Sequence, residues 1–154
     1  MSGEIEGRLK ELGLELPPAP APVANYVPAL IAGNLLFVSG QIAKSADGHV
    51  VTGSVGGDLT VEEGQQAARL CALNILAQAK AALGSLDRIA RVVRLTGFVN
   101  AGPGFADHPQ VVNGASDLMV EVLGDKGRHT RAAVGASGLP ANTAVEVDAI
   151  LAIT

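Results

Sequence analysis

The segment from Thr60 to Gly84 limits the folds open to this chain more than any other. Thr60-Val61-Glu62-Glu63 matches a capping box, in which a threonine and a glutamate three residues later bind each other's backbone N–H groups. The glycine at position 84 is typical of a helix stop. The pattern predicts one long helix whose apolar face must pack against another layer. That face is formed by Ala68, Cys71, Ile75, Ala79 and Ala82, with Leu76 and Leu83 beside it.

Apolar segments on both sides of this helix predict the second layer. Asp47-Gly48 is a strong hairpin signal. A second helix is expected where Pro109 suits a first turn and Gly124 an end. The predicted order is strand, strand, helix, strand, helix, strand, strand, which gives an α+β two-layer fold with two helices on one face of a mixed β-sheet. The strands are expected at residues 35–42, 49–52, 89–99, 131–137 and 144–153.

The chain carries little charge for its size. Its 154 residues suit one domain, since domains have ~150 residues. Only 17% of the residues are Asp, Glu, Lys or Arg, against about 25% in a typical soluble domain. The two predicted helices cover only one face of the sheet, so no helix is left to cover the other face. The last strands are strongly apolar, so that uncovered face would expose apolar side chains. We therefore expect copies of the chain to associate through that face.

Several classes of protein are disfavoured. A 48% apolar content argues against disorder, and prolines interrupt the charge-free residues 16–43, so no membrane span is expected. The net charge is −4 and the basic residues form no run, which makes nucleic acid an unlikely partner. The three histidines lack metal-ligand spacing, so no metal is expected. A single cysteine and a charged N-terminal segment predict a cytoplasmic protein.

Residues 1–24 are expected to form an arm before the domain of residues 25–154. Ile5, Leu9 and Leu12 repeat at helical spacing, which predicts a short helix that ends near Gly13. A proline-rich stretch, residues 17–22, then predicts a stiff, extended tether.

Three charges stand out in the apolar C-terminal strands. Arg131, Glu146 and Asp148 are the only charged residues from position 131 to the end. Glu146 and Asp148 are two residues apart, so they project from the same strand face. One interpretation is a solvent-facing stripe, with Arg131 as a structural ion-pair partner. The other is a binding site, because a guanidinium matches a carboxylate in a bidentate manner and a nearby carboxylate can orient water.

Two motifs resemble the YjgF/Rid family, also described as RidA-like or endoribonuclease L-PSP. Leu36-Phe37-Val38-Ser39-Gly40-Gln41-Ile42 is similar to the hydrophobic-SGQI strand of that family. Arg131-Ala132-Ala133-Val134, followed by Leu139-Pro140 and by Val145-Glu146-Val147-Asp148, is similar to its C-terminal signature. The similarity runs from about Asn25 to the end, and the N-terminal arm resembles a longer-chain subgroup.

This resemblance implies a chorismate-mutase-like fold and a homotrimer with sites in the clefts between subunits. Arg131 stands where the family binds the substrate carboxylate, and Glu146 where it holds the attacking water; both are catalytic by this resemblance. Four further residues fall at positions that line the family's cleft. These four residues are Tyr26, Ser39, Gly40 and Asn113. No metal and no organic cofactor is implied by the resemblance.

The resemblance implies an enamine/imine deaminase that hydrolyses 2-aminoacrylate-type enamines and 2-imino acids to 2-keto acids and ammonia. A second hypothesis is a non-catalytic trimer that binds small carboxylates as a sensor or chaperone-like module, because Ala132 and Ala133 stand where many active members carry Ser, Thr or Cys. A third, an endoribonuclease or translation inhibitor, fits the acidic charge and the scarce aromatic residues poorly.

Overall fold

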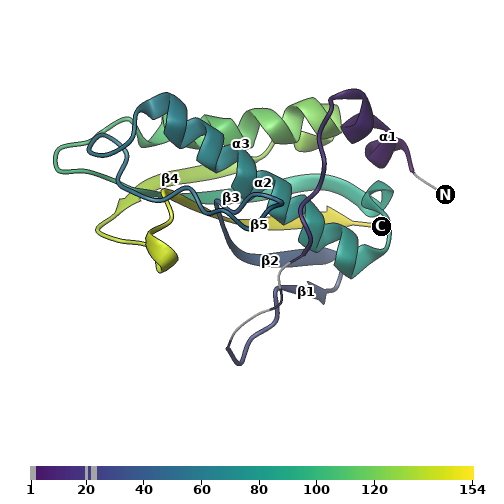
Figure 1. Ribbon diagram of the computed structural model, residues 1–154. Coiled ribbons are helices and arrows are strands. Elements are labelled where there is room, and N and C mark those ends of the chain that lie inside the picture. The colour runs from purple at the N-terminus through teal and green to yellow at the C-terminus, as the bar shows by residue number, and fades with distance from the viewer. Residues whose placement is uncertain (1–2, 20, 22–23) are drawn as a thin grey trace.

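A computed structural model describes residues 3–19, 21 and 24–154. It contains three α-helices, five strands and three short 3-10 helices in that part of the chain (Figure 1). In chain order these are α1 (Glu4–Glu11), β1 (Ala29–Ala32), β2 (Leu35–Ile42), α2 (Val61–Leu83), η1 (Leu86–Arg88), β3 (Ile89–Asn100), α3 (His108–Leu123), η2 (Gly124–Gly127), β4 (Thr130–Ala136), η3 (Pro140–Asn142) and β5 (Val145–Ile153).

The strands form one mixed sheet in the order β1-β2-β5-β3-β4. All neighbours are antiparallel except β3 and β4, which are parallel and joined through α3. Helices α2 and α3 lie side by side over one face of the sheet (Figure 1), and the hydrophobic core fills the space between the two layers. The predicted α+β two-layer architecture, with two helices on one face of a mixed sheet, is confirmed.

Helix α2 begins and ends where the sequence predicts. The backbone N–H of Glu63 donates to Oγ1 of Thr60 at 3.1 Å, and the N–H of Thr60 donates to Oε1 of Glu63 at 3.0 Å. Gly84 follows the last turn with a φ of 81°, a left-handed conformation that glycine adopts without strain. Cys71 lies fully buried on the helix face that packs on the core, as the apolar spacing predicts.

One sequence prediction in the strand region is wrong, and one strand was missed. Residues 49–52 form no strand, because Val50 and Thr52 each pair with another segment only in an isolated bridge. The additional strand is β1, whose four residues pair antiparallel with β2 at the edge of the sheet. The predicted order of elements survives because β1 replaces the segment at 49–52. The Asp47-Gly48 turn is present, with the N–H of Gly48 bound to the carbonyl of Ser45 at 3.0 Å.

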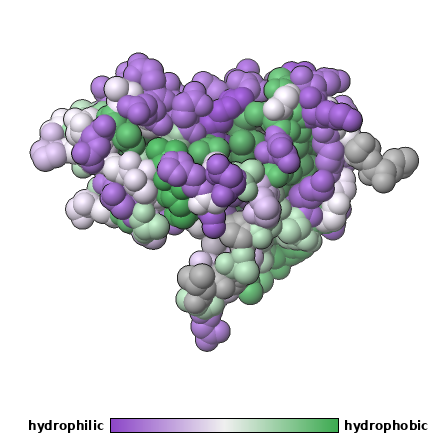
Figure 2. Space-filling view, in the orientation of Figure 1, coloured by the Kyte–Doolittle hydropathy of each residue, from purple (hydrophilic) through white to green (hydrophobic). Residues whose placement is uncertain are grey.

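The sheet face opposite the helices exposes apolar side chains. Glu146, Asp148 and Ile150 alternate along β5 with fully or almost fully buried residues, and all three are half-buried. Figure 2 shows apolar surface over the β1 and β2 side of the molecule. The exposed large apolar residues are Tyr26, Val27, Leu30, Ile31, Phe37 and Val134. An uncovered apolar face is typical of an interaction surface.

Helix α1 packs against α3 and η1 and places Leu9 in the core. Its first turn is capped by a residue that is far away in the sequence, because the N–H groups of Glu4 and Ile5 each donate to the Asp87 carboxylate at 3.0 Å. In return, Oε1 of Glu6 accepts the N–H of Leu86 at 3.1 Å. The predicted helix near the N-terminus is confirmed. Part of the predicted proline tether, residues 20 and 22, lies outside the described residues.

Candidate functional site

Glu146 lies in a cleft where β2, β5, α2 and the turn η3 meet. The cleft has a volume of about 420 Å³. Of the residues that the sequence singles out, it brings together Tyr26, Gly40 and Glu146, and Gln41 and Pro140 complete this part of the wall. The register of β2 against β5 shifts between Val38 and Gln41. This irregularity places Gly40, rather than a larger side chain, beside the carboxylate.

The carboxylate of Glu146 lies directly over the backbone of Gly40. A Cβ atom on Gly40 would come within 3.0 Å of the carboxylate, closer than real Cβ atoms approach another atom. Burial raises the pKa of Glu146, and the negative charge of Asp148 raises it further. The site therefore holds a carboxylate that retains its proton to a higher pH than an exposed glutamate.

We expect Gly40→Ala to disable this carboxylate without unfolding the protein. The added methyl group must displace the Glu146 side chain, because both cannot occupy the same space. Any turnover that depends on Glu146 should fall by about 10-fold or more, since catalytic groups tolerate little displacement. Gly7→Ala is the matched control, because no atom lies within 4 Å of a Cβ at that position. Equal activities of the two variants would show that the position of Glu146 is unimportant.

Cys71 is a structural thiol near the same cleft. It is fully buried, and Sγ donates to the carbonyl oxygen of Val145 at 3.3 Å. Burial strongly raises the pKa of this thiol, and the charge of Glu146 raises it further. A thiol in this environment stays protonated and is a poor nucleophile, so Cys71 belongs to the core, as its place on the apolar helix face predicts.

Ser39 and Tyr26 line a second, shallower hollow on the open face of the sheet. Its volume is about 580 Å³, and Arg94, Thr96 and Asp148 form part of its wall. Oγ of Ser39 donates to the carbonyl of Val27 at 2.9 Å, which ties β2 to the segment that carries Tyr26. Burial raises the pKa of Asp148, against the opposing effects of a Thr96 hydrogen bond and the Arg94 charge. Tyr26 borders both hollows.

Arg131 and Asn113 form a separate cluster between β4 and α3. Nη1 of Arg131 donates to Oδ1 of Asn113 at 2.8 Å and to Oγ of Ser116 at 3.1 Å. Asn113 and Ser116 are three residues apart, so both side chains lie on the same helix face. Within residues 3–19, 21 and 24–154, no carboxylate pairs with Arg131, and its Nε and Nη2 atoms make no hydrogen bond. The edge formed by Nε and Nη2, called the open edge below, therefore has no hydrogen-bond partner among the described residues.

The sequence-predicted residues thus fall into two groups in one copy of the chain. Tyr26, Ser39 and Gly40 lie with Glu146 around β2 and β5. Arg131 and Asn113 lie at β4, and strand β3 separates β4 from β5 in the sheet. Neither the cleft that contains Glu146 nor the neighbouring hollow that contains Asp148 includes Arg131 among the described residues of its wall.

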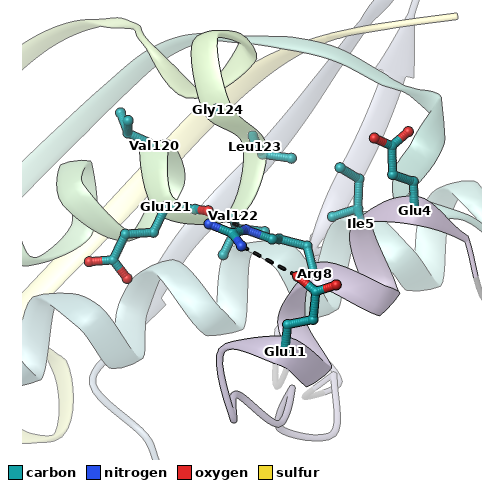
Figure 3. Close-up of a pocket in the computed structure, with 9 residues that line it drawn as sticks. All are labelled: Glu4, Ile5, Arg8, Glu11, Val120, Glu121, Val122, Leu123 and Gly124. Carbon is teal, nitrogen blue, oxygen red and sulfur yellow. Dashed lines mark hydrogen bonds and ion pairs between the residues drawn. The ribbon is translucent and has the colours of Figure 1, made fainter.

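A further groove lies between α1 and the C-terminal end of α3, and its volume is about 410 Å³. Figure 3 shows the residues that line it. Arg8 crosses it, where Nε donates to the Glu121 carbonyl at 3.1 Å and Nη1 lies 3.4 Å from a carboxylate oxygen of Glu11. None of the sequence-predicted site residues lines this groove. Its contacts join α1 to α3, so it belongs to the docking of the N-terminal helix.

Two features are absent from the part of the chain that the structure describes, a cluster of metal-ligating side chains and a membrane-spanning helix. That part contains no group of three or more His, Cys, Asp or Glu residues able to hold a metal ion. None of its helices is long and apolar enough to cross a membrane.

Sequence reasoning missed two residues of the Arg131 cluster, Ser116 and His129. Nε2 of His129 lies 2.9 Å from Oγ of Ser116, which in turn accepts from Arg131. The three-residue spacing between Asn113 and Ser116 was a readable signal, because both side chains must share a helix face. His129 carries no such signal, since its contact depends on how η2 and β4 return to α3.

Comparison with known proteins identifies the family. Residues 6–151 match the family model described as "YjgF/chorismate mutase-like, putative endoribonuclease". The chain is 51% identical over 151 residues to Protein TCP17 from Trypanosoma cruzi, covering 97% of this chain and 94% of that protein. It is 56% identical to Atu1372 from Agrobacterium tumefaciens, a protein of unknown function, with a TM-score of 0.90 over 97% of this chain and 94% of the other.

A more distant solved structure is that of TdcF from E. coli with bound serine. It shares 25% identity and a TM-score of 0.62 over 88% of this chain and 94% of TdcF. The family match spans nearly the whole sequence, including part of the N-terminal arm. The chain therefore belongs to the YjgF/chorismate mutase-like family.

Proposed function

We propose that the protein is an enamine/imine deaminase that converts 2-imino acids, and the enamines from which they arise, to 2-keto acids and ammonia. The open guanidinium edge of Arg131 carries this proposal. Nη1 is held by two neutral oxygens, which leaves Nε and Nη2 for the two oxygens of a substrate carboxylate. The serine bound in the TdcF structure is a small molecule with such a carboxylate.

The chemistry needs positioning more than a strong nucleophile. The carbon of a protonated imine is already electrophilic, so water can add once it is held against that carbon. Glu146 accepts a proton from the water as the C–O bond forms, which gives a carbinolamine. The amine nitrogen then takes up a proton, the C–N bond breaks, and the hydroxyl loses its proton. The products are one keto acid and one ammonia for each imine and water consumed.

We further propose that the complete site forms between copies of the chain in a homotrimer. In one copy, Arg131 lies on β4 and is absent from the wall of the Glu146 cleft, and β3 separates β4 from β5 in the sheet. The apolar side chains exposed on the open face of the sheet supply a surface for association. Arg131 of one copy and Glu146 of its neighbour would then face the same substrate, with Tyr26, Ser39 and Gly40 from the neighbour and Asn113 from the first copy.

The proposal is tested by following imine hydrolysis directly. An amino-acid oxidase generates 2-imino acids from a panel of amino acids, and semicarbazide traps the imine that remains. The protein should lower the amount of trapped imine and speed the appearance of ammonia and keto acid. An unchanged rate with every amino acid in the panel, at protein equimolar with the imine, would contradict deaminase activity.

The raised pKa of Glu146 predicts the pH dependence of the reaction. Glu146 must be ionised to accept a proton from water, so kcat/KM should fall as the pH drops through the pKa of its carboxyl group. Because that pKa is raised, the loss should begin at a higher pH than for an ordinary glutamate. The pH profile of the wild type, measured with a direct imine absorbance assay, checks this. An activity that rises as the pH is lowered through the acid range would contradict the role of Glu146.

A non-catalytic carboxylate-binding trimer is the second candidate, favoured by Ala132 and Ala133 beside Arg131, which offer no hydroxyl or thiol to a substrate. It would show thermal stabilisation by small 2-keto acids, lost in Arg131→Ala, without turnover of any imine.

An endoribonuclease is a weaker candidate, because the net charge of −4 opposes binding to RNA. The single cysteine is buried and forms no disulfide, which supports a cytoplasmic location of the protein whichever of these functions it has.

A further inference from the structure

We propose that Ser116 and His129 are positioning residues that fix the guanidinium of Arg131 through a directional chain of hydrogen bonds. This inference rests on the proposed function in one respect, that Arg131 binds the substrate carboxylate. Neither residue was expected from the sequence, and neither lines the clefts that contain Glu146 and Tyr26. Their contribution is made through Arg131.

The direction of the hydrogen bonds follows from the last acceptor in the series, the carbonyl oxygen of Gly127. Nδ1 of His129 lies 2.5 Å from the carbonyl oxygen of Gly127, and a carbonyl can only accept, so Nδ1 carries the hydrogen. The Nε2 atom of the neutral ring is then an acceptor. It lies 2.9 Å from Oγ of Ser116, which therefore donates its only hydrogen to the ring. The lone pairs of Oγ remain for Nη1 of Arg131, at 3.1 Å.

The last acceptor in this series of hydrogen bonds is held in place because Gly127 packs closely against helix α3. Gly127 is buried, and a Cβ atom there would approach the carbonyl oxygen of Met119 to within 3.0 Å. The short helix η2 thus brings a backbone carbonyl against the same helix that carries Asn113 and Ser116. Asn113 and Ser116, the two side chains that hold Arg131, both lie on α3. Ser116 is also held through His129, whose ring is bound to the Gly127 carbonyl.

His129 therefore decides what Ser116 offers to Arg131. A serine within a helix can also donate its hydroxyl to the carbonyl of the preceding turn. With Nε2 of His129 as the acceptor, the hydrogen points to the ring instead, and the oxygen is directed at Arg131. A side chain as flexible as arginine loses affinity for a ligand when it must be ordered on binding. Fixing Nη1 in advance leaves the Nε and Nη2 edge aligned for a carboxylate.

The two ring nitrogens allow a matched test. In His129→Asn the amide nitrogen occupies the place of Nδ1 and keeps the bond to Gly127, but nothing reaches Ser116. In His129→Gln the amide oxygen reaches the place of Nε2 and still accepts from Ser116. A purely structural role would make the two variants fail alike. Positioning predicts that His129→Asn raises KM about 10-fold with kcat within about 3-fold, because loss of a uniform binding interaction acts on KM, and that His129→Gln restores most of the affinity.

Ser116→Ala completes a double-mutant cycle. If His129 acts through Ser116, the double variant Ser116→Ala/His129→Asn should show no greater loss than Ser116→Ala alone, which is the signature of coupled residues. His49→Asn serves as the control, because His49 is an exposed histidine in the Asp47-Gly48 hairpin. Additive losses, or equal KM values for His129→Asn and His49→Asn, would overturn the inference.

A readout that needs no turnover separates this inference from the proposed function. In NMR spectra of the intact protein with ¹⁵N-labelled arginine, the Nη1 and Nη2 signals of Arg131 should be resolved in the wild type and in His129→Gln. They should broaden toward each other in His129→Asn, because the guanidinium rotates faster once the support through Ser116 is weakened and only the Asn113 bond remains. If this pattern holds and no imine is hydrolysed, the positioning chain stands and the deaminase proposal fails. If imine is hydrolysed while Arg131 gives the same signals in all variants, the positioning chain fails and the deaminase proposal stands.

Discussion

Arg131→Ala should reduce kcat/KM for imine hydrolysis by about 100-fold or more. The open edge of the guanidinium offers two charge-assisted hydrogen bonds, and each such bond contributes about 1.5–3 kcal/mol. Their joint loss amounts to about 3 kcal/mol at the lower end, and each 1.4 kcal/mol corresponds to about 10-fold in rate. The measurement is kcat/KM for the wild type and the variant with the same imine, generated in the same way.

Two further variants make the Arg131 result specific. Arg131→Lys keeps the charge but loses the planar fork, so it should retain only part of the activity. Arg8→Ala removes an arginine that also donates to α3, at the Glu121 carbonyl, but lies in the groove beside α1 (Figure 3). It should leave kcat/KM unchanged. An Arg131→Ala variant with more than about one third of the wild-type kcat/KM would be incompatible with carboxylate binding by Arg131.

Glu146→Gln should nearly abolish turnover and at the same time stabilise the fold at neutral pH. A general base contributes about 100-fold or more to the rate, and glutamine cannot accept the proton. The stability effect follows from linkage. A carboxyl group whose pKa is raised on folding contributes its stability below the unfolded pKa, and this contribution is lost as the pH rises through the folded pKa. Glutamine stays neutral at every pH, so the unfavourable buried charge is removed.

The matched control is Glu15→Gln, which replaces an exposed glutamate and should change neither kcat nor Tm. Thermal unfolding of Glu146→Gln at pH 5 and pH 8 checks the sign, because the gain in Tm over the wild type should be larger at the higher pH. A lower Tm with undiminished kcat would identify Glu146 as a structural residue instead.

Helix α2 and strand β2 could be predicted to the residue, because each carries its own local signals. The capping box at Thr60 and the glycine at position 84 fix α2, and the apolar run at 35–42 fixes β2. Strand β1 has four residues, three of them exposed, and shows no alternation to reveal it. Its existence depends on pairing with β2, a contact between segments that local patterns do not encode.

The candidate site was only partly readable for the same reason. The resemblance singled out Arg131, Glu146 and Gly40, but not the close approach of the Glu146 carboxylate to the Gly40 backbone, which arises from the register shift between β2 and β5. The link from Arg131 through Ser116 to His129 likewise depends on how η2 brings β4 back to α3. Tertiary geometry decides such contacts, so sequence spacing alone cannot supply them.

The most direct test of an active site shared between copies is complementation by mixed subunits. Arg131→Ala and Glu146→Gln, each inactive alone, are unfolded together in equal amounts and refolded. If one copy supplies Arg131 and its neighbour supplies Glu146, random assembly restores an intact pair at about a quarter of the sites, and activity should return to about a quarter of that of refolded wild type. If a single copy supplied both residues, every site would lack one of them, and the mixture would stay as inactive as the separate variants.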